Sequence, residues 1–284
     1  MPTSIRGPER TGRVGCPTAG AATAAHVSGT PPDIDATVEP AAVAVDLGSG
    51  FTRIWTAGRP TLSVPTISDS LTNPTRLVHR GRITDTAGYE QLLTRLLRRF
   101  HRPQPAGAVV VACRPVLATA DDEDTARRLL TAVFAPSRLL FIDTVRAAAI
   151  GAGATPGVLL VADVGAQLTE VAVLTGGGVA AARRADVGVS DLIAPTEPDP
   201  IVHTIVDLVG DMRRDPHCRD LTGIVARRGL LLVGGAATRP ELAARTAGAL
   251  GMAVRPAARP RAAAVRGAGL AALAALRRAA MTAT

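Results

Sequence analysis

The chain has 284 residues, and 47% of them are hydrophobic, which is enough apolar material for the core of one large domain or two modest ones. It contains no lysine, so all 32 basic residues are arginines. A P-loop nucleotide site and a lysine Schiff base are therefore excluded, because both need a lysine side chain. The net charge is +8, but the arginines are scattered in short pairs and aromatic residues make up only 2%, so we expect no nucleic-acid partner.

The cysteines and the apolar runs of the sequence indicate where in the cell the protein is expected to be. Cys16, Cys113 and Cys218 are far apart and form no Cys-x-x-Cys motif, so the sequence predicts neither a disulfide framework nor a zinc site. The longest apolar run, residues 267–276, is too short to span a bilayer, and the first residues contain no apolar signal segment. These features predict a cytoplasmic protein without a transmembrane segment, and peripheral membrane contact stays open.

Regular structure is expected to begin after a low-complexity stretch. Residues 1–39 are rich in Pro, Gly, Thr and Ala and show no periodicity, so we expect a disordered tail. From residue 41, AAVAVDL predicts a buried strand, Gly-Ser-Gly a turn and FTRIWTA a returning strand, and short irregular segments follow at 58–83. The elements expected next are a helix at 90–100, a strand at 107–113, a helix from the Thr119 N-cap to Phe134, a strand at 138–142 and a helix at 145–152.

The pattern then restarts in a second half. GVLLVAD, at 157–163, predicts a buried strand, and residues 163–169, DVGAQLT, align with residues 46–52, DLGSGFT. Each aligned segment lies between a buried strand and its hairpin partner, which indicates an internal duplication. Alternating strands and helices predict an α/β fold. The remaining elements expected are strands at 169–174 and 178–186, a helix at 200–212, a strand at 230–233, a helix at 240–250, a strand at 252–255 and a helix at 261–278.

The two matched turns carry residues suited to a polyphosphate and its metal ion. Asp46 and Asp163 each end a buried strand, where a carboxylate can hold Mg²⁺ or its waters. The small residues that follow let backbone N–H groups approach phosphate oxygens. Gly234 and Gly235, which precede a helical pattern, are a third place of close backbone approach. A plainer interpretation stays open, in which the two aspartates only cap turns.

The order of these motifs resembles the actin and heat-shock-chaperone ATPase superfamily, and most of all the MreB-type bacterial actin homologues. VAVDLGSGFTRIW is similar to the first phosphate loop of that family, and LLVADVGAQLTEVAVL to the second. FIDTVRAAAIGAG and PRAAAVRGAGLAAL resemble its two connecting helices, and LLLVGGAATRPELAART resembles its adenosine loop. The resemblance implies an α/β fold of duplicated ribonuclease-H-like (actin-like ATPase) inner domains.

The same resemblance implies a domain organisation. Residues 40–153 would form the first inner domain, with a small outer lobe at 58–83, and the helix at 261–278 would complete it. Residues 154–260 would form the second inner domain. Because few residues separate Leu192 from the next expected helix, this second domain has no room for an outer lobe.

The resemblance also implies roles for individual residues. Asp46 and Asp163 would organise Mg²⁺, and the adenosine part of ATP would pass along Gly234 and Gly235. The phosphates would lie between the two loops. The loop residues expected to contact them are Gly48, Ser49, Gly50, Thr52, Gly165 and Thr169.

Two departures from the family pattern bear on catalysis. Thr144, with Asp143 one residue earlier, stands where the family usually has a glutamate that positions the attacking water; these two are the candidate catalytic residues, unless they are only a helix N-cap. A hydroxyl polarises water less strongly than a carboxylate. Residues 166–168, Ala-Gln-Leu, replace the usual glycines of the second loop. We therefore expect weak ATP binding and, at most, a slow ATPase.

The expected function is that of a reduced MreB-like actin homologue that takes part in cell shape or cell-wall assembly. Its expected partners are another bacterial actin homologue or cell-wall assembly proteins. Two alternatives stay open: a pseudo-ATPase adaptor that keeps the fold to bind other proteins, and a small-molecule kinase of the same superfamily. The kinase alternative has no evident substrate lobe and no candidate base beyond Asp143.

Overall fold

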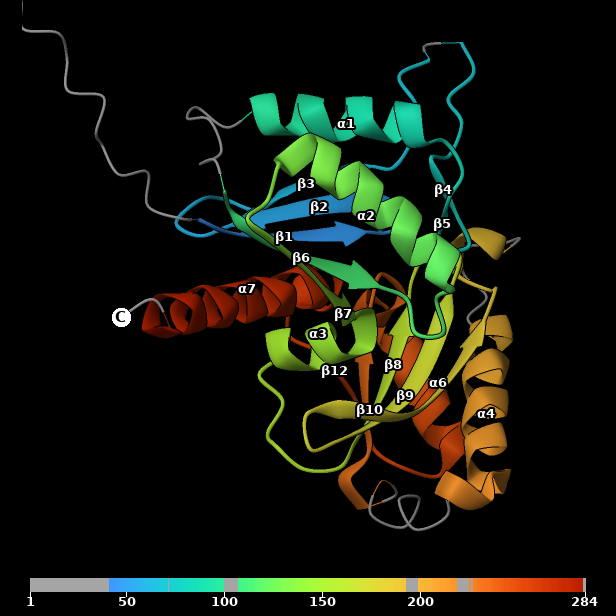
Figure 1. The fold of residues 1–284 in the computed structure, drawn as a ribbon. Helices are drawn as coiled ribbons and strands as arrows, with labels where there is room; N and C mark the ends of the chain where they lie inside the picture. Colours follow the sequence, from blue (N-terminus) through green and yellow to red (C-terminus); the bar gives the residue numbers. More distant parts are fainter. Residues whose placement is uncertain are drawn as a thin grey trace, which may run out of the picture. The chain divides into compact units, whose positions relative to one another are not determined.

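Two five-stranded sheets with helices on their faces, and one two-stranded hairpin, make up the part of the chain that the structure describes (Figure 1). The computed structural model describes residues 41–70, 72–99, 107–192, 199–218, 225 and 227–282, all of which belong to one unit, Val38–Thr284. The tail expected at residues 1–39 lies outside the described residues. The expected α/β fold class is confirmed.

The first sheet places β1 at its centre, as the buried AVAVDL run predicts. β1 pairs antiparallel with β2 and parallel with β6, so four of its six residues are fully covered by neighbours. In spatial order the strands are β3 (Leu62–Pro65), β2 (Phe51–Thr56), β1 (Ala42–Leu47), β6 (Val109–Arg114) and β7 (Arg138–Asp143).

The second sheet repeats this topology. Its first strand in the chain, β8, is again central and pairs antiparallel with the next strand and parallel with the fourth. In spatial order the strands are β10 (Gly178–Ala185), β9 (Thr169–Thr175), β8 (Leu159–Val164), β11 (Leu230–Val233) and β12 (Val254–Pro256). The internal duplication is therefore confirmed, and we call residues 41–143 the first half and residues 159–256 the second half.

Helices cover the outer face of each sheet. α1 (Thr86–Arg98) and α2 (Ala120–Phe134) pack on the first sheet, and α4 (Asp199–Arg214) and α6 (Pro240–Leu250) pack on the second (Figure 1). α2 begins where the sequence predicts, because the Thr119 hydroxyl accepts a hydrogen bond from the backbone N–H of Asp122.

Two further helices, α3 (Thr144–Gly151) and α7 (Ala263–Thr282), lie between the sheets and share one apolar core with both of them (Figure 1). The two helices approach so closely that a β-carbon on Gly267 would overlap the carbonyl oxygen of Ala147. A β-carbon on Gly269 would lie 2.5 Å from the ring of Trp55. These glycines therefore serve close packing of α7 against α3 and the first sheet.

Local structure differs from expectation at the start of α1, in the segment 58–83 and at Gly234. α1 begins at Thr86, four residues before the expected start, because the Asp85 side chain caps it by accepting a hydrogen bond from the Gly88 N–H. The segment 58–83 contains β3 and a short hairpin of β4 (Val78–His79) and β5 (Arg82–Ile83). The pair Gly234–Gly235 does not open an α-helix, because a 3-10 helix, Ala236–Thr238, comes first and α6 begins only at Pro240. Gly234 has a φ of 88°, a left-handed conformation that ends the strand and cannot start a helix.

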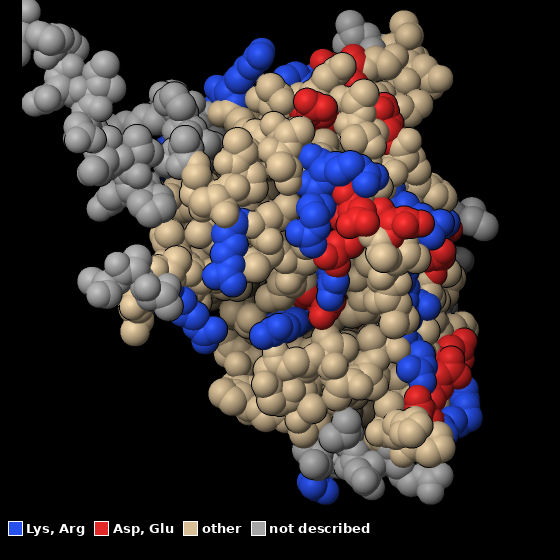
Figure 2. Space-filling view, viewed as in Figure 1, with Lys and Arg blue, Asp and Glu red and all other residues tan. Residues whose placement is uncertain are grey.

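The surface in Figure 2 carries arginines interleaved with acidic residues. Around the start of α2, for example, Arg114 and Arg127 both pair with Glu123, and Arg82 lies 3.4 Å from Asp122. Among the residues that the structure describes, no helix is long and apolar enough to cross a membrane.

Candidate functional site

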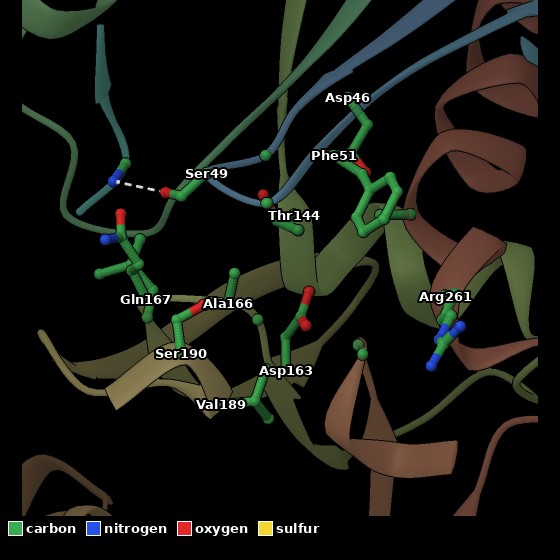
Figure 3. Close-up of a pocket in the computed structure, with 18 of the residues that line it drawn as sticks. Asp46, Ser49, Phe51, Thr144, Asp163, Ala166, Gln167, Val189, Ser190 and Arg261 are labelled. Atoms are coloured by element: carbon green, nitrogen blue, oxygen red, sulfur yellow. Dashed lines mark hydrogen bonds between the residues drawn. The ribbon is translucent and has the colours of Figure 1, made fainter. Parts of the chain in front are cut away.

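A cavity of about 720 Å³ lies between the two halves. The turn after β1 and the turn after β8 face each other across it (Figure 3). Pockets of this size ordinarily hold a drug-sized ligand or a cofactor. The sequence-predicted residues that line it are Asp46, Gly48, Ser49, Gly50, Thr144, Asp163, Gly165, Gly234 and Gly235.

Asp46 lies near the end of β1, opposite Arg53 of β2. The Arg53 guanidinium donates a hydrogen bond to the Asp46 carboxylate at 3.1 Å, and the two side chains are only 15% and 13% exposed. Burial raises the pKa of Asp46, and the positive charge of Arg53 opposes this rise. Because Arg53 also lines the cavity, the site contains a cation that can contact an anionic ligand.

Asp163 occupies the matching position of β8, opposite Glu170 of β9. Burial and, to a smaller extent, the negative charge of Asp46 raise the pKa of Asp163 to about 7. Burial and the charge of Asp163 raise the pKa of Glu170 to about 8. Buried carboxyl groups that lie near one another favour a bound proton or cation, because their negative charges repel in a medium of low dielectric. The acidic end of the cavity is therefore suited to a cation.

The tips of the two turns are in contact with each other. A β-carbon on Gly50 would lie 2.8 Å from the β-carbon of Ala166. The Ala166 methyl group therefore fills the space that a glycine at position 166 would leave open between the two turns. The Ser49 hydroxyl accepts a hydrogen bond from the backbone N–H of Gly81 at 3.3 Å, so it points toward the β4–β5 hairpin (Figure 3). The crowding that the sequence predicts at the second loop is present on its Ala166 side.

Gly234 lies against Asp163, where a β-carbon would overlap the carboxylate. Gly235 borders open space, because nothing lies within 4 Å of the position of its β-carbon. Position 234 must therefore be glycine for the backbone to pass beside Asp163. The open space beside Gly235 leaves room for a ligand.

The two candidate catalytic residues lie in different surroundings. Thr144 lines the cavity, but its hydroxyl donates a hydrogen bond to the backbone carbonyl of Arg114 at 2.9 Å. Asp143 is paired with the Arg114 guanidinium at 3.2 Å and is not among the described residues that line the cavity. Asp143 is the residue before α3, and its side chain makes no capping hydrogen bond there. Their catalytic roles stay a prediction.

Thr52 and Thr169 are placed outside the cavity lining. The Thr52 hydroxyl lies 2.8 Å from the Tyr89 hydroxyl and 2.9 Å from that of Thr66, in the core of the first half. The Thr169 hydroxyl donates to the carbonyl of Val187 at 2.8 Å in the second half. Both threonines follow the duplicated turns, and the hydroxyl of each is bound to other residues of its own half.

Sequence reasoning missed five charged residues that line the cavity, among them Arg76, Arg239 and Arg261. The other two, Arg53 and Glu170, belong to the duplicated segments. In the duplicated segments they occupy equivalent places, since Arg53 is paired across the hairpin with Asp46 and Glu170 with Asp163. Extending the alignment of the two segments by one residue would have identified both. The opposite charges at these equivalent places make the two sides of the cavity electrostatically different.

The residues present fit Mg²⁺ and a nucleotide. Among the described residues, no group of three or more His, Cys, Asp or Glu side chains is arranged to hold a metal ion. Mg²⁺ does not need such a cage, because it is usually bound by one or two carboxylates, waters and the phosphates of a ligand. Asp46 and Asp163 supply the carboxylates, and the cavity has the volume for a nucleotide.

Comparisons with known proteins agree with this arrangement. The model of the MreB/Mbl protein family matches residues 37–194, more than half of the chain. Among solved structures, MreB5 of Spiroplasma citri bound to ADP is similar with a TM-score of 0.72 and 14% identity, over 84% of this chain and 98% of that one.

Two other solved structures share the fold. A chain of the MamK double helical filament has a TM-score of 0.68 and 13% identity, over 81% of this chain and 98% of that one. The ethanolamine utilization protein EutJ from Carboxydothermus hydrogenoformans has a TM-score of 0.55 and 18% identity, over 81% of this chain and 89% of that one. No curated protein sequence matches the chain.

The likeness to these structures shows the duplicated, actin-like ATPase fold that the sequence motifs imply. The match to the family model includes both duplicated segments, 46–52 and 163–169, and the helix between the two halves, α3. The chain therefore belongs to the MreB/Mbl protein family.

Proposed function

We propose that the chain is an MreB-like actin homologue of the cytoplasm that takes part in cell shape or cell-wall assembly and binds Mg²⁺-ATP weakly in the cavity between its halves. The observation that carries the nucleotide proposal is the pair Asp46 and Asp163, which two equivalent turns bring to one cavity. The similar MreB5 structure was determined with ADP bound. The proposed partners are another bacterial actin homologue or cell-wall assembly proteins.

Each residue has a defined part in this proposal. Asp46 and Asp163 hold the metal ion or its waters, and Arg53 contacts a phosphate. Backbone N–H groups of residues 48–50 and of Ala166 face the phosphates from the two sides, and Gly235 borders the adenosine part. The Gly165 N–H donates to the Leu168 carbonyl at 2.8 Å, so Gly165 contributes only the space that its missing side chain leaves. When bound, the metal ion neutralises phosphate charge and polarises the terminal phosphate.

Hydrolysis is expected to be slow or absent, because neither Thr144 nor Glu170, two described residues of the cavity lining, is a free base that could orient water. The Thr144 hydroxyl already donates to the Arg114 carbonyl. Glu170 has a pKa raised to about 8 by its burial and by Asp163, so it is mostly protonated at neutral pH. A protonated carboxyl cannot accept the proton of an attacking water.

A specific observation favours a second candidate, a pseudo-ATPase adaptor. Ala166 fills the gap beside Gly50, and the Ser49 hydroxyl is engaged by Gly81, so two features of the phosphate loops oppose phosphate binding. A thermal-shift measurement with and without Mg²⁺-ATP separates the candidates, because an adaptor that binds no nucleotide shows no shift. A kinase is less supported, since Asp143, its only candidate base, is paired with Arg114.

The decisive experiment is isothermal titration of the whole chain with ATP, in the presence and absence of magnesium. We expect a dissociation constant in the micromolar range or weaker, about 8 kcal/mol or less of binding free energy. Asp46→Asn and Asp163→Asn should each remove the magnesium-dependent part of binding. The matched control is Asp211→Asn, because Asp211 is half exposed on α4 and pairs with Arg214 on the same helix.

Two results would contradict the proposal. Nanomolar affinity for ATP would show that the loops are not crowded. Unchanged affinity in both aspartate variants would show that these carboxylates do not hold the metal ion.

A further inference from the structure

The β4–β5 hairpin of the first half ends in a turn with an unusual backbone. Arg80 has a φ of 50° and Gly81 a φ of 77°, so both turn residues are left-handed. This pair of conformations forms the tight turn that two-residue hairpins need. Glycine adopts it freely, whereas an arginine in this region carries a conformational cost. A non-glycine residue held in such a conformation suggests that its side chain is needed at that place.

The Arg80 side chain crosses to the second half. Its guanidinium donates two hydrogen bonds of 2.6 Å to the two carboxylate oxygens of Asp191, in the 3-10 helix Val189–Asp191. It also donates to the backbone carbonyl of Gln167 at 3.0 Å. The Arg80 and Asp191 side chains are only 24% and 29% exposed, which strengthens a bidentate pair relative to one in open solvent.

The backbone of the same turn is also bound to the second half. The Arg80 N–H donates to the Gln167 side-chain oxygen at 3.2 Å, and the Arg80 carbonyl accepts from Arg184 of β10 at 2.7 Å. The backbone N–H, the backbone carbonyl and the side chain of Arg80 are therefore all hydrogen-bonded to residues of the second half.

The turn contacts both loops of the cavity as well. The Gly81 N–H donates to the Ser49 hydroxyl of the first loop at 3.3 Å. A β-carbon on Gly81 would lie 2.8 Å from the Leu168 side chain of the second loop, so the turn rests directly on that loop. The hairpin thus touches the two loops at once, at the edge where the halves meet.

We propose that the β4–β5 turn is a latch that holds the two halves closed over the cavity without a bound nucleotide, with Arg80 as its central residue and Asp191 as its main partner. The hydrogen bonds of Arg80 named above join the turn of the first half directly to the second half. Opening the cavity requires breaking these contacts together. The proposal goes beyond nucleotide binding and concerns the nucleotide-free chain.

The test is amide hydrogen exchange of the nucleotide-free full chain, followed in peptides that cover residues 78–83, 165–168 and 189–192. In the wild-type protein these segments should exchange slowly. Arg80→Ala should raise their exchange rates by about tenfold or more, the effect expected from losing several hydrogen bonds to a charged group. Asp191→Asn breaks the same pair from the other side and should raise the rates as well.

The matched control is Arg82→Ala on the same hairpin. Arg82 is 60% exposed and lies near Asp122 within its own half, so exchange in the three segments should stay at the wild-type rate. Combining Arg80→Ala with Asp191→Asn should add little to either single change, because both break one contact. Equal exchange in wild type and Arg80→Ala would overturn the proposal, as would an equal rise in Arg82→Ala. Failure of the chain to bind ATP would not change either result.

Discussion

The Arg53 guanidinium donates a hydrogen bond to the Asp46 carboxylate inside the cavity. This relationship places a positive charge beside one of the two proposed metal ligands, in the hairpin of the first half. On the second-half side the equivalent residue is the acidic Glu170. Arg76, Arg239 and Arg261 line the cavity as well, so Arg53 is one of several cations that an anionic ligand can meet there.

Replacing Arg53 should weaken ATP binding. In Arg53→Gln the phosphates lose a charge-assisted hydrogen bond, so we expect the affinity for Mg²⁺-ATP to fall about tenfold in isothermal titration. Arg214→Gln, at a side chain that is 73% exposed on α4, should leave the affinity unchanged. Equal affinity in Arg53→Gln and wild type would show that Arg53 serves only Asp46.

Supplying a carboxylate at the start of α3 should speed hydrolysis. The Thr144 hydroxyl is engaged by the Arg114 carbonyl, so Thr144→Val should leave ATP turnover unchanged. In Thr144→Glu a carboxylate can orient water, and we expect turnover to rise by up to about 100-fold at saturating ATP. Turnover is measured by release of inorganic phosphate. A clear loss of turnover in Thr144→Val would show that the hydroxyl itself acts on water.

Stability of the nucleotide-free chain should fall as the pH rises. The pKa of Glu170 is raised from 4.5 to about 8 on folding, and that of Asp163 from 3.8 to about 7. At a pH below the usual pKa values of 3.8 and 4.5, both carboxyls are protonated in the folded and the unfolded chain. At a pH above these usual pKa values only the folded chain keeps the protons. The free energy of unfolding therefore decreases with rising pH until the pH passes the raised pKa values of the folded chain.

The slope is at most about 1.4 kcal/mol per pH unit for each carboxyl. Urea denaturation at a series of pH values measures it. Glu170→Gln keeps an oxygen that can accept the hydrogen bond from the Val116 N–H, now 2.5 Å long, but removes the titration. This variant should show a flatter pH dependence than wild type, and an unchanged slope would contradict the assignment to Glu170.

Packing of α3 against α7 should tolerate no side chain at Gly267. Gly267→Ala places a β-carbon on the Ala147 carbonyl, so the helices must separate, and we expect a loss of about 1–3 kcal/mol in the free energy of unfolding. Gly248→Ala is the matched control in α6, because nothing lies within 4 Å of its β-carbon position. It should stabilise the chain by about 0.5 kcal/mol, since alanine favours helix more than glycine does. Thermal or urea denaturation of the two variants checks both signs.

The chain should not form filaments alone, although the similar MamK structure is a double helical filament. Filament growth needs a head-to-tail contact between sizeable complementary faces, and between β3 and α1 the described residues form only the short β4–β5 hairpin that could contribute to one. The net charge of +8 adds repulsion at low salt. Sedimentation with Mg²⁺-ATP should leave the protein in the supernatant, and a nucleotide-dependent pellet of ordered filaments would contradict this. Co-sedimentation with a longer bacterial actin homologue would support it.

The sequence by itself determined the fold class, the duplication and most elements. Buried strand runs such as AVAVDL and LLVADV, the Thr119 cap of α2 and the repeated Asp-x-Gly turns are local signals, because they depend on residues close together in the chain. The same signals placed Asp46 and Asp163 at strand ends, from which their meeting in one cavity could be predicted.

Only the tertiary structure decided which side chains face that cavity. Thr52 and Thr169 belong to the motifs, yet they turn into the cores of their own halves, because the two faces of a strand point in opposite directions. Arg80 and Asp191 are 111 residues apart, and neither is marked by any local pattern. Their contact exists because the hairpin of one half reaches the loop edge of the other, and such a long-range pairing is encoded by the packing of both halves rather than by the residues around either one.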